Sequence, residues 1–245
     1  VPAAARDSVT HDPAFRRQIV SAYAPGQSIH WPVGEGPTSE TVETIVAEDR
    51  PLGLEQGLVV FFTGLSGSGK STLAQALSNR LIETGGRSVS LLDGDIVRRN
   101  LSRGLSFSRE DRETNIERIG WVASEIARHG GLAICSPIAP FDQTRKVARA
   151  FAEDIGAAFV LVHVATPLEE CERRDRKGLY AKARRGEIEE FTGISSPYEV
   201  PLDAELSFDT TDRTVEDVLD QILTFLVGRG WLPADQRDSV TLGAT

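Results

Sequence analysis

The stretch LVVFFTGLSGSGKST, Leu58–Thr72, decides how this chain folds. Its first six residues form a short, wholly apolar run, which is typical of a strand buried on both faces of a sheet. The run leads into a glycine-rich loop, and residues 71–84 then have the composition of a helix that ends at Gly85 and Gly86. A buried strand, a glycine loop and a helix in this order predict an anion-binding turn at the end of the strand.

Residues 64–71 of this loop, GLSGSGKS, fit the phosphate-loop pattern G-x-x-x-x-G-K-[ST] at each fixed position. Glycines let successive backbone N–H groups turn inward around a phosphate, and the helix dipole adds to the attraction. Lys70 is expected to reach the β- and γ-phosphates, and Ser71 to place its hydroxyl on Mg²⁺. The residues predicted to bind the nucleotide are Gly64, Leu65, Ser66, Gly67, Ser68, Gly69, Lys70, Ser71 and Thr72. The motif by itself leaves NTPases, molecular switches and small-molecule kinases open.

From Gly57 onward, strand and helix patterns alternate along the chain. Further strands are expected at residues 88–93, 132–137, 158–164 and 205–211, and further helices at residues 111–130, 144–156, 167–175 and 215–230. The polar, glycine-punctuated residues 175–198 show no core-facing period, and we interpret them as a mobile segment. The alternation predicts an α/β fold, with a parallel sheet of about five strands and helices on both faces.

The composition of the chain limits the binding partners and the cellular compartment that we expect. The formal charge of −9 argues against a basic surface that binds nucleic acid, although a single cleft can still be basic. Cys135 and Cys171 show neither zinc-site spacing nor a disulfide pattern. No apolar run is long enough for a membrane span, and the signal-peptide order is missing, so we expect a cytoplasmic protein with reduced thiols. The sequence contains no Met, so we also expect a processed chain or a fragment of a longer one.

Two carboxylates follow the second predicted strand, in the run LLDGDIVRRN at residues 91–100. Ligands of open α/β sheets bind at the carboxyl ends of the strands, so Asp93 and Asp95 are expected beside the glycine loop. Carboxylates in this position can hold Mg²⁺ or take the proton of an attacking hydroxyl. A solvated Asp-Gly turn is the alternative interpretation of the same residues.

Several motifs, found in the same order, resemble adenylylsulfate (APS) kinase, a family of P-loop kinases. They are LDGDIVR, LSFSREDRETN, DRKGLYAKA and FTGISSPYE, and the likeness extends from about Gln56 to Leu226. The resemblance implies transfer of the γ-phosphoryl group of ATP to the 3′-hydroxyl of adenosine 5′-phosphosulfate, with Mg²⁺, to give 3′-phosphoadenylylsulfate (PAPS). It also implies a P-loop kinase fold whose mobile lid closes over both nucleotides.

The resemblance also implies roles for single residues. Phe107 and Phe191 are expected to enclose the acceptor's adenine, and Asp95 to lie near its 3′-hydroxyl and Mg²⁺. The implied acceptor-binding residues are Asp95, Arg98, Phe107, Arg112, Asn115, Ile138, Lys177, Leu179 and Phe191. The implied catalytic residues are Lys70 and Asp95, the metal ligands Ser71 and Asp95, and the lid residues Arg174, Lys177 and Lys182. Because phosphoryl transfer depends mainly on positioning and charge neutralisation, Asp95 is expected to act as base or positioning group.

One position departs from the family's pattern. Many members carry Ile-Ser-Pro after the third strand, and that serine has been regarded as a phosphorylated intermediate. This chain has Ile138-Ala139-Pro140 instead. Ala139 has no hydroxyl, so direct transfer from ATP to the acceptor is the expected route.

The remaining expectations concern the ends and the assembly of the chain. We predict a kinase domain over residues 57–230, an N-terminal extension or linker over 1–56, and a tail over 231–245. The run IVAEDRPLGLEQG resembles the junction of proteins in which ATP sulfurylase is fused to this kinase. Residues 1–56 are therefore a sulfurylase-like remnant or tether, or else an unrelated extension. The resemblance also implies a homodimer and an ATP sulfurylase partner.

Two other functions remain open from the sequence. One is a P-loop kinase for sugars or nucleosides, and the other is a nucleotide-binding regulatory module without transfer activity. The arginines near Phe107 favour an anionic, nucleotide-like acceptor over a neutral sugar. An intact phosphate loop together with Asp95 argues against a silent module.

Overall fold

The computed structural model of the protein describes residues 52–234. Most of the predicted N-terminal extension and most of the predicted tail lie outside the described residues. The boundaries predicted for the domains therefore stay predictions.

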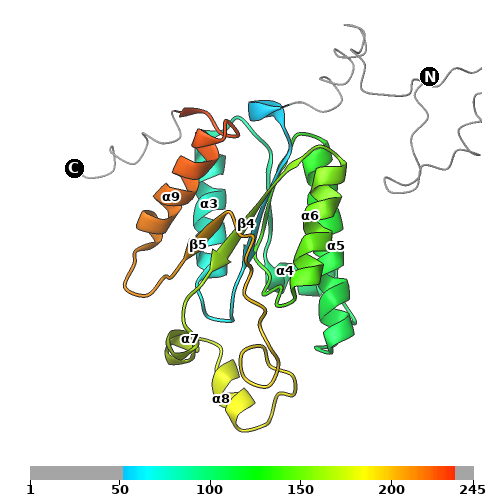
Figure 1. The fold of residues 1–245 in the computed structure, drawn as a ribbon, viewed down its shortest axis with the longest axis vertical. Coiled ribbons are helices and arrows are strands. Elements are labelled where there is room, and N and C mark those ends of the chain that lie inside the picture. Colours follow the sequence, from blue (N-terminus) through cyan, green and yellow to red (C-terminus); the bar gives the residue numbers. More distant parts are fainter. Residues whose placement is uncertain (1–51, 235–245) are drawn as a thin grey trace, which may run out of the picture. The chain divides into compact units, whose positions relative to one another are not determined.

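A single parallel sheet confirms the predicted α/β fold (Figure 1). Its strands are β1 (Leu58–Thr63), β2 (Val89–Leu92), β3 (Leu132–Cys135), β4 (Ala158–Val164) and β5 (Leu206–Phe208), in the order β2-β3-β1-β4-β5. The helices are α3 (Lys70–Thr84), α4 (Gly94–Asn100), α5 (Arg109–Arg128), α6 (Asp142–Asp154), α7 (Leu168–Arg174), α8 (Leu179–Arg184) and α9 (Val215–Gly228), with a 3₁₀ turn at Gly53–Glu55.

Strand β1 lies in the middle of the sheet and is buried along its whole length. It is parallel to both neighbours, and Val60 lies beside Ile134 of β3 and Val160 of β4. Since side chains alternate along a strand, Val60 and Phe62 pack into the core on one face and Phe61 into the core on the other. This explains why the run is wholly apolar instead of alternating with polar residues.

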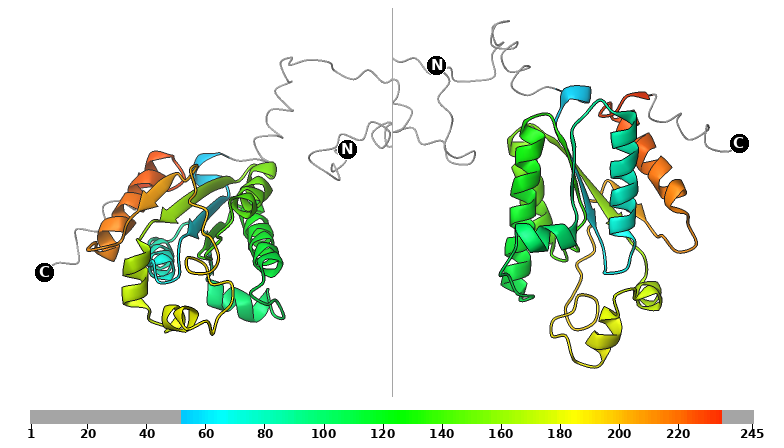
Figure 2. Two further views of the ribbon diagram at one scale, coloured as in Figure 1. Left: turned by 60° about the horizontal axis from the view of Figure 1, so that its bottom comes forward. Right: turned by 180° about the vertical axis from the view of Figure 1, so that it is seen from behind.

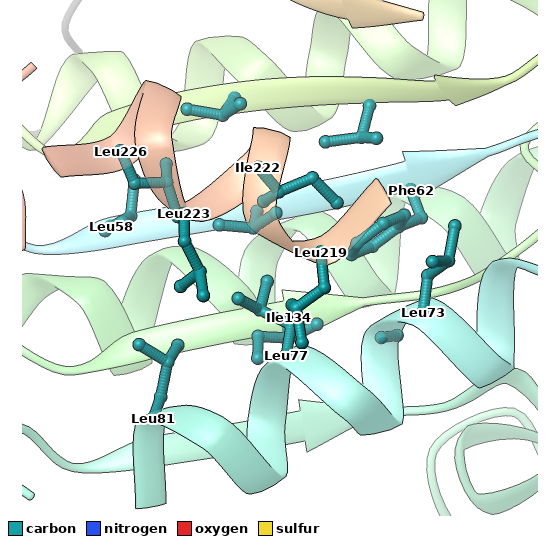
Figure 3. Close-up of a cluster of buried hydrophobic side chains, with 14 of the residues drawn as sticks. Leu58, Phe62, Leu73, Leu77, Leu81, Ile134, Leu219, Ile222, Leu223 and Leu226 are labelled. Atoms are coloured by element: carbon teal, nitrogen blue, oxygen red, sulfur yellow. The ribbon is translucent and has the colours of Figure 1, made fainter. Parts of the chain in front are cut away.

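Helices cover both faces of the sheet. Helices α3 and α9 lie side by side on one face, and α5 and α6 on the other (Figures 1 and 2). Figure 3 shows how leucines of α3 meet Leu219, Ile222 and Leu223 of α9 over the strands. None of the helices in residues 52–234 is long and apolar enough to cross a membrane.

Two short helices were not predicted. Helix α4 follows β2 directly and contains Asp95, and α8 lies within residues 175–198, which the sequence pattern left without regular structure. We call residues 175–198 the lid segment. In Figure 1 helices α7 and α8 lie at the end of the sheet to which β4 points.

A cluster of hydrogen bonds ties the segments at the amino ends of the strands together. The Arg87 guanidinium donates to the carbonyls of Trp231 (3.1 Å), Gly130 (3.0 Å) and Gln56. The Gln56 side chain accepts from the Trp231 indole N–H at 2.9 Å and donates to the Gly156 carbonyl at 2.9 Å. The segment before β1 and the segment after α9 therefore share one anchor.

The core between α3, α9 and the sheet is expected to carry much of the stability. Ile222 is completely buried in this core, so Ile222→Ala should lower the free energy of unfolding by about 2–5 kcal/mol. Ile82 on α3 is 61% exposed, and Ile82→Ala should change the free energy by no more than about 0.5 kcal/mol. Urea unfolding of both variants measures the difference. Equal losses would show that this core does not dominate stability.

Candidate active site

A cavity of about 1640 Å³ opens at the carboxyl ends of the strands, where the sequence predicts the ligand site. The phosphate loop, α4, the start of α5, the lid segment and the loop after β5 all contribute to its wall. Among the side chains that the structure describes, eight Lys or Arg and seven Asp or Glu line it, whereas the whole chain has 27 basic and 36 acidic residues. The cavity is therefore less acidic than the chain as a whole, as a site for anionic ligands requires.

Most of the predicted site residues lie around this one cavity. Those that line it are Ser66, Gly67, Gly69, Lys70, Ser71, Thr72, Arg98, Phe107, Arg112, Asn115, Ile138, Arg174, Lys177, Leu179 and Phe191. Gly64, Leu65 and Ser68 belong to the loop but do not line the cavity, and Lys182 is exposed on α8 outside the cavity wall. Asp95 is the second residue of α4, but its side chain lies outside the described part of the structure.

The start of the phosphate loop has no room for a side chain. A Cβ at Gly64 would come within 2.5 Å of the Val164 carbonyl oxygen at the end of β4, and the φ of Gly64 is +148°. The Gly64 N–H donates to the Ile138 carbonyl at 3.3 Å. Strand β4 and the segment after β3 thus fix where the loop leaves β1.

Two threonines anchor the middle of the loop. The hydroxyls of Thr166 and Thr210 each lie 3.0 Å from the Ser68 carbonyl and 2.8 Å from each other. Arg174 at the end of α7 donates to the Thr210 hydroxyl at 2.9 Å and forms an ion pair with Glu170 at 2.7 Å. The loop is therefore bound to the ends of β4 and β5 as well as to its own helix.

Lys70 is almost fully buried at the start of α3. Its ammonium donates to the Leu65 carbonyl at 2.6 Å and lies 3.4 Å from the Ser68 hydroxyl. Burial lowers the pKa of Lys70 to about 8, against smaller opposite effects of Cys171 and Asp93. An anion that enters the loop would stabilise the charged form of this buried ammonium.

Arg112 projects from the first turns of α5 and is also buried. Its guanidinium donates to the hydroxyls of Thr192 and Ser196, each at 3.1 Å, and forms an ion pair with Glu190 at 3.1 Å. It also lies over the ring of Phe141, 5.2 Å from the centroid. The lid segment thus supplies the carboxylate that Arg112 contacts.

Aromatic and polar groups complete the same side of the cavity. The Arg98 guanidinium lies 4.2 Å from the centroid of Phe107, whose side chain is largely exposed at the cavity rim. Asn115 accepts a hydrogen bond from the Ser102 hydroxyl. The rings of Tyr180 and Phe191 form a T-shaped contact, with centroids 5.0 Å apart.

Hydrogen bonds from the end of β1 and from α6 hold the segment Ile138–Pro140 in place. The Thr63 hydroxyl donates to the Ile138 carbonyl at 2.7 Å, and Arg145 donates to the Ala139 carbonyl at 2.8 Å. Ala139 is buried and has a positive φ of 46°, an uncommon conformation for a residue other than glycine. Arg145 also donates to the Glu199 carbonyl at 2.8 Å. Ala139, which stands where many family members have serine, therefore lies in a backbone segment that hydrogen bonds hold in place.

Sequence patterns did not single out several residues of this site. Thr166, Thr210, Arg145 and Tyr180 each bridge elements that lie far apart in the sequence, and the first three belong to no motif on which the predictions rest. Only Tyr180 could have been identified from the sequence, because it lies in the run KGLYAKA, which is part of a motif on which the resemblance was based.

A buried parallel strand, a phosphate loop, a helix start and a charged cavity under a lid segment define the class of P-loop kinases. Residues 56–209 match the family described as adenylylsulphate kinase. This match covers more than half of the chain, so the chain belongs to the adenylylsulphate kinase family.

The curated relatives are longer proteins. The sulfate adenylyltransferase of Neosartorya fischeri is 48% identical over 200 residues, which are 82% of this chain and 35% of that protein. The corresponding protein of Aspergillus terreus is 47% identical over 78% of this chain and 34% of its own length. The chain spans about a third of the length of the curated relatives it matches. A match to part of proteins named for the sulfurylase reaction confirms the predicted likeness to the kinase part of a sulfurylase–kinase fusion.

Solved structures agree with this assignment. The APS kinase CysC of Mycobacterium tuberculosis, in complex with AMPPNP and APS, is 43% identical with a TM-score of 0.67, over 70% of this chain and 98% of that chain. The hexameric APS kinase of Thiobacillus denitrificans is 40% identical with a TM-score of 0.62, over 95% of this chain and 39% of that chain.

The burial of Lys70 should be visible in its titration. In the ligand-free protein Lys70 should lose its proton around pH 8, because burial disfavours the charged ammonium. Lys146 should keep its proton to higher pH, since a hydrogen bond from its ammonium to Asp142 raises the pKa of Lys146. NMR of isotope-labelled lysine side chains measures both, and Lys70→Arg assigns the signal. A Lys70 midpoint above pH 10 would contradict the buried environment.

Proposed function

We propose that the protein phosphorylates the 3′-hydroxyl of adenosine 5′-phosphosulfate with ATP, giving PAPS and ADP. The observation that carries the proposal is the joint lining of one cavity by the phosphate loop and by the residues implied to bind the acceptor. Membership of the adenylylsulphate kinase family supports the same acceptor. The solved relative from M. tuberculosis is described in complex with AMPPNP and APS, so a protein of similar fold holds two nucleotides together.

In the proposed step, the 3′-oxygen of the acceptor forms a bond to the γ-phosphorus, and the bond from that phosphorus to the β,γ-bridging oxygen breaks. ADP leaves with the bond electrons, and the hydroxyl proton passes to a carboxylate or to water. Lys70 would stabilise negative charge on the transferred group, and Asp95 would receive the proton or orient the hydroxyl. Ala139 offers no hydroxyl for a phosphorylated intermediate, which supports direct in-line transfer.

The residues present fit a magnesium ion. Mg²⁺ takes oxygen ligands, usually from one or two side chains, several waters and substrate phosphates. Ser71 and Asp93 line the same cavity, and the Ser136 hydroxyl orients Asp93 by donating to Oδ2 at 3.0 Å. Among the side chains described in residues 52–234, no three His, Cys, Asp or Glu gather into a metal site of their own. When bound, Mg²⁺ neutralises charge on the phosphates.

Incubation with ATP, Mg²⁺ and adenylylsulfate tests the proposal directly. We expect PAPS and ADP in equal amounts, and no phosphorylation of glucose, gluconate or adenosine offered in the same assay. Turnover of one of these acceptors without PAPS formation would refute the proposed function and support the alternative of another small-molecule kinase.

Asp95→Asn should lower turnover by about 10²-fold or more while the dissociation constant for ATP changes little, since the amide cannot accept the proton. Asp93→Asn is the matched comparison, because Asp93 lies at the same end of β2 and already accepts a hydrogen bond from Ser136. Steady-state kinetics and ATP titration measure both variants. An unchanged turnover number in Asp95→Asn, with a large loss in Asp93→Asn, would assign the role to the other carboxylate.

Arg112→Ala should raise the KM for adenylylsulfate by about 10- to 100-fold, the range for a lost charge-assisted hydrogen bond, with ATP affinity unchanged. Glu190→Gln is the complementary variant, since the Glu190 carboxylate forms an ion pair with Arg112 in the ligand-free chain. An acceptor anion would compete with that carboxylate, so Glu190→Gln should lower the KM. A fall in ATP affinity in Arg112→Ala would contradict the proposed placement.

Three further proposals concern the compartment, the partner and the oligomeric state of the protein. Both cysteines are free and buried, in keeping with a reducing cytoplasm. The likeness to part of longer sulfate adenylyltransferases supports an ATP sulfurylase partner or neighbouring domain. The homodimer stays a prediction. One solved relative is described as hexameric.

A further inference from the structure

Tyr180 is the second residue of α8 and has no role in the function proposed so far. Only 2% of its surface is exposed, and it lies in the wall of the active-site cavity. The Asp175 carboxylate fixes the start of its helix by accepting from the backbone N–H groups of Tyr180 at 3.1 Å and Ala181 at 3.0 Å. A buried tyrosine on a short capped helix has a defined orientation.

The hydroxyl of Tyr180 reaches the phosphate loop. It donates to the Ser66 carbonyl at 2.8 Å. In a trans peptide the C=O and the following N–H point in opposite directions, so this bond also fixes the direction of the Gly67 N–H. Gly67 lines the cavity, and loop N–H groups are the donors expected to face a phosphate. Burial raises the pKa of Tyr180 well above its usual value, so the phenol stays a donor at physiological pH.

The ring of Tyr180 faces the other half of the site. It forms a T-shaped contact with Phe191 at 5.0 Å between centroids, with the planes at 77°, a favourable geometry for two aromatic rings. Phe191 begins a tight turn in which its N–H donates to the Ser195 hydroxyl at 2.8 Å. Tyr180 therefore contacts the donor loop with one end and the expected acceptor aromatic with the other.

A second contact joins the same two parts of the site. Gly193, two residues after Phe191, has a φ of +92°, and a Cβ there would lie 3.0 Å from a methyl carbon of Leu65. The lid segment thus touches two adjacent residues of the phosphate loop, Leu65 and Ser66. These contacts link the loop to the turn that carries Phe191.

From this geometry we propose that Tyr180 is a positioning residue that couples the donor and acceptor sites, so that each nucleotide favours the lid arrangement that the other needs. The inference rests on the proposed function for the identity of the two nucleotides. In this proposal Tyr180 does not contact the reacting groups. It acts through the Ser66 peptide on one side and through Phe191 on the other.

Calorimetric titration with AMPPNP and with adenylylsulfate, each alone and in the presence of the other, tests the coupling. In the wild type each ligand should bind several-fold tighter when the other is present, by the same factor in both orders. Tyr180→Phe keeps the ring and removes the hydroxyl. It should weaken AMPPNP by about tenfold, because the Ser66 carbonyl loses its donor, and should bring the coupling factor close to one.

Two other variants separate positioning from a general loosening of the lid. Tyr180→Leu should also weaken adenylylsulfate alone, since Phe191 loses its aromatic partner. Arg184→Ala removes the ion pair of α8 with Glu172, which is 2.8 Å long, without touching the loop, and should leave the coupling factor unchanged.

The inference fails if Tyr180→Phe retains the wild-type coupling factor, or if Arg184→Ala loses it equally. It also fails if the wild type shows no coupling while forming PAPS normally. Absence of PAPS from the wild type would instead refute the proposed function. The AMPPNP titration needs no turnover, so unchanged AMPPNP binding in Tyr180→Phe would overturn the inference in that case too.

Discussion

The carboxyl end of β1 is held from both sides, and the geometry of the site depends on this constraint. The strand lies between β3 and β4 and is buried on both faces. At its last residue the Thr63 hydroxyl binds the Ile138 carbonyl from the β3 side, while the Val164 carbonyl of β4 leaves space only for glycine at position 64. The chain therefore has one direction in which to leave the sheet, and the phosphate loop begins there.

Charge is organised locally in a chain that is acidic as a whole. Lys70 and Arg112 are buried, yet each is held by hydrogen bonds to protein oxygen atoms. Groups held in this way lose little conformational freedom when an anion arrives, which favours charge neutralisation during phosphoryl transfer. The net charge of the sequence could not reveal this, because it sums the charges of the whole chain, whereas only some of those charges line the cavity.

Local signals in the sequence were enough for the sheet and for the phosphate loop, whereas most other residues of the cavity wall were expected only from the resemblance to a known family. The apolar run at β1 and the spacing of the phosphate loop depend on neighbouring residues only, so their structure was predictable. Helix α4 was missed because seven residues with a single buried apolar side chain, Val97, show no helical period. The ion pair between Arg112 and Glu190 and the bond from Tyr180 to Ser66 join residues 78 and 114 positions apart. Such pairs arise from the packing of distant segments, which one sequence does not encode as a pattern.

The anchor formed by Arg87, Gln56 and Trp231 has a mechanical consequence. The segment before β1 and the segment after α9 are bonded to each other at the amino ends of the strands, whereas the cavity opens at the carboxyl ends. A pull applied through either segment would load these hydrogen bonds before it strained the sheet. The hydrogen bonds of the anchor and the cavity therefore lie at opposite ends of the strands, so load on the anchor is separated from the cavity by the length of the sheet.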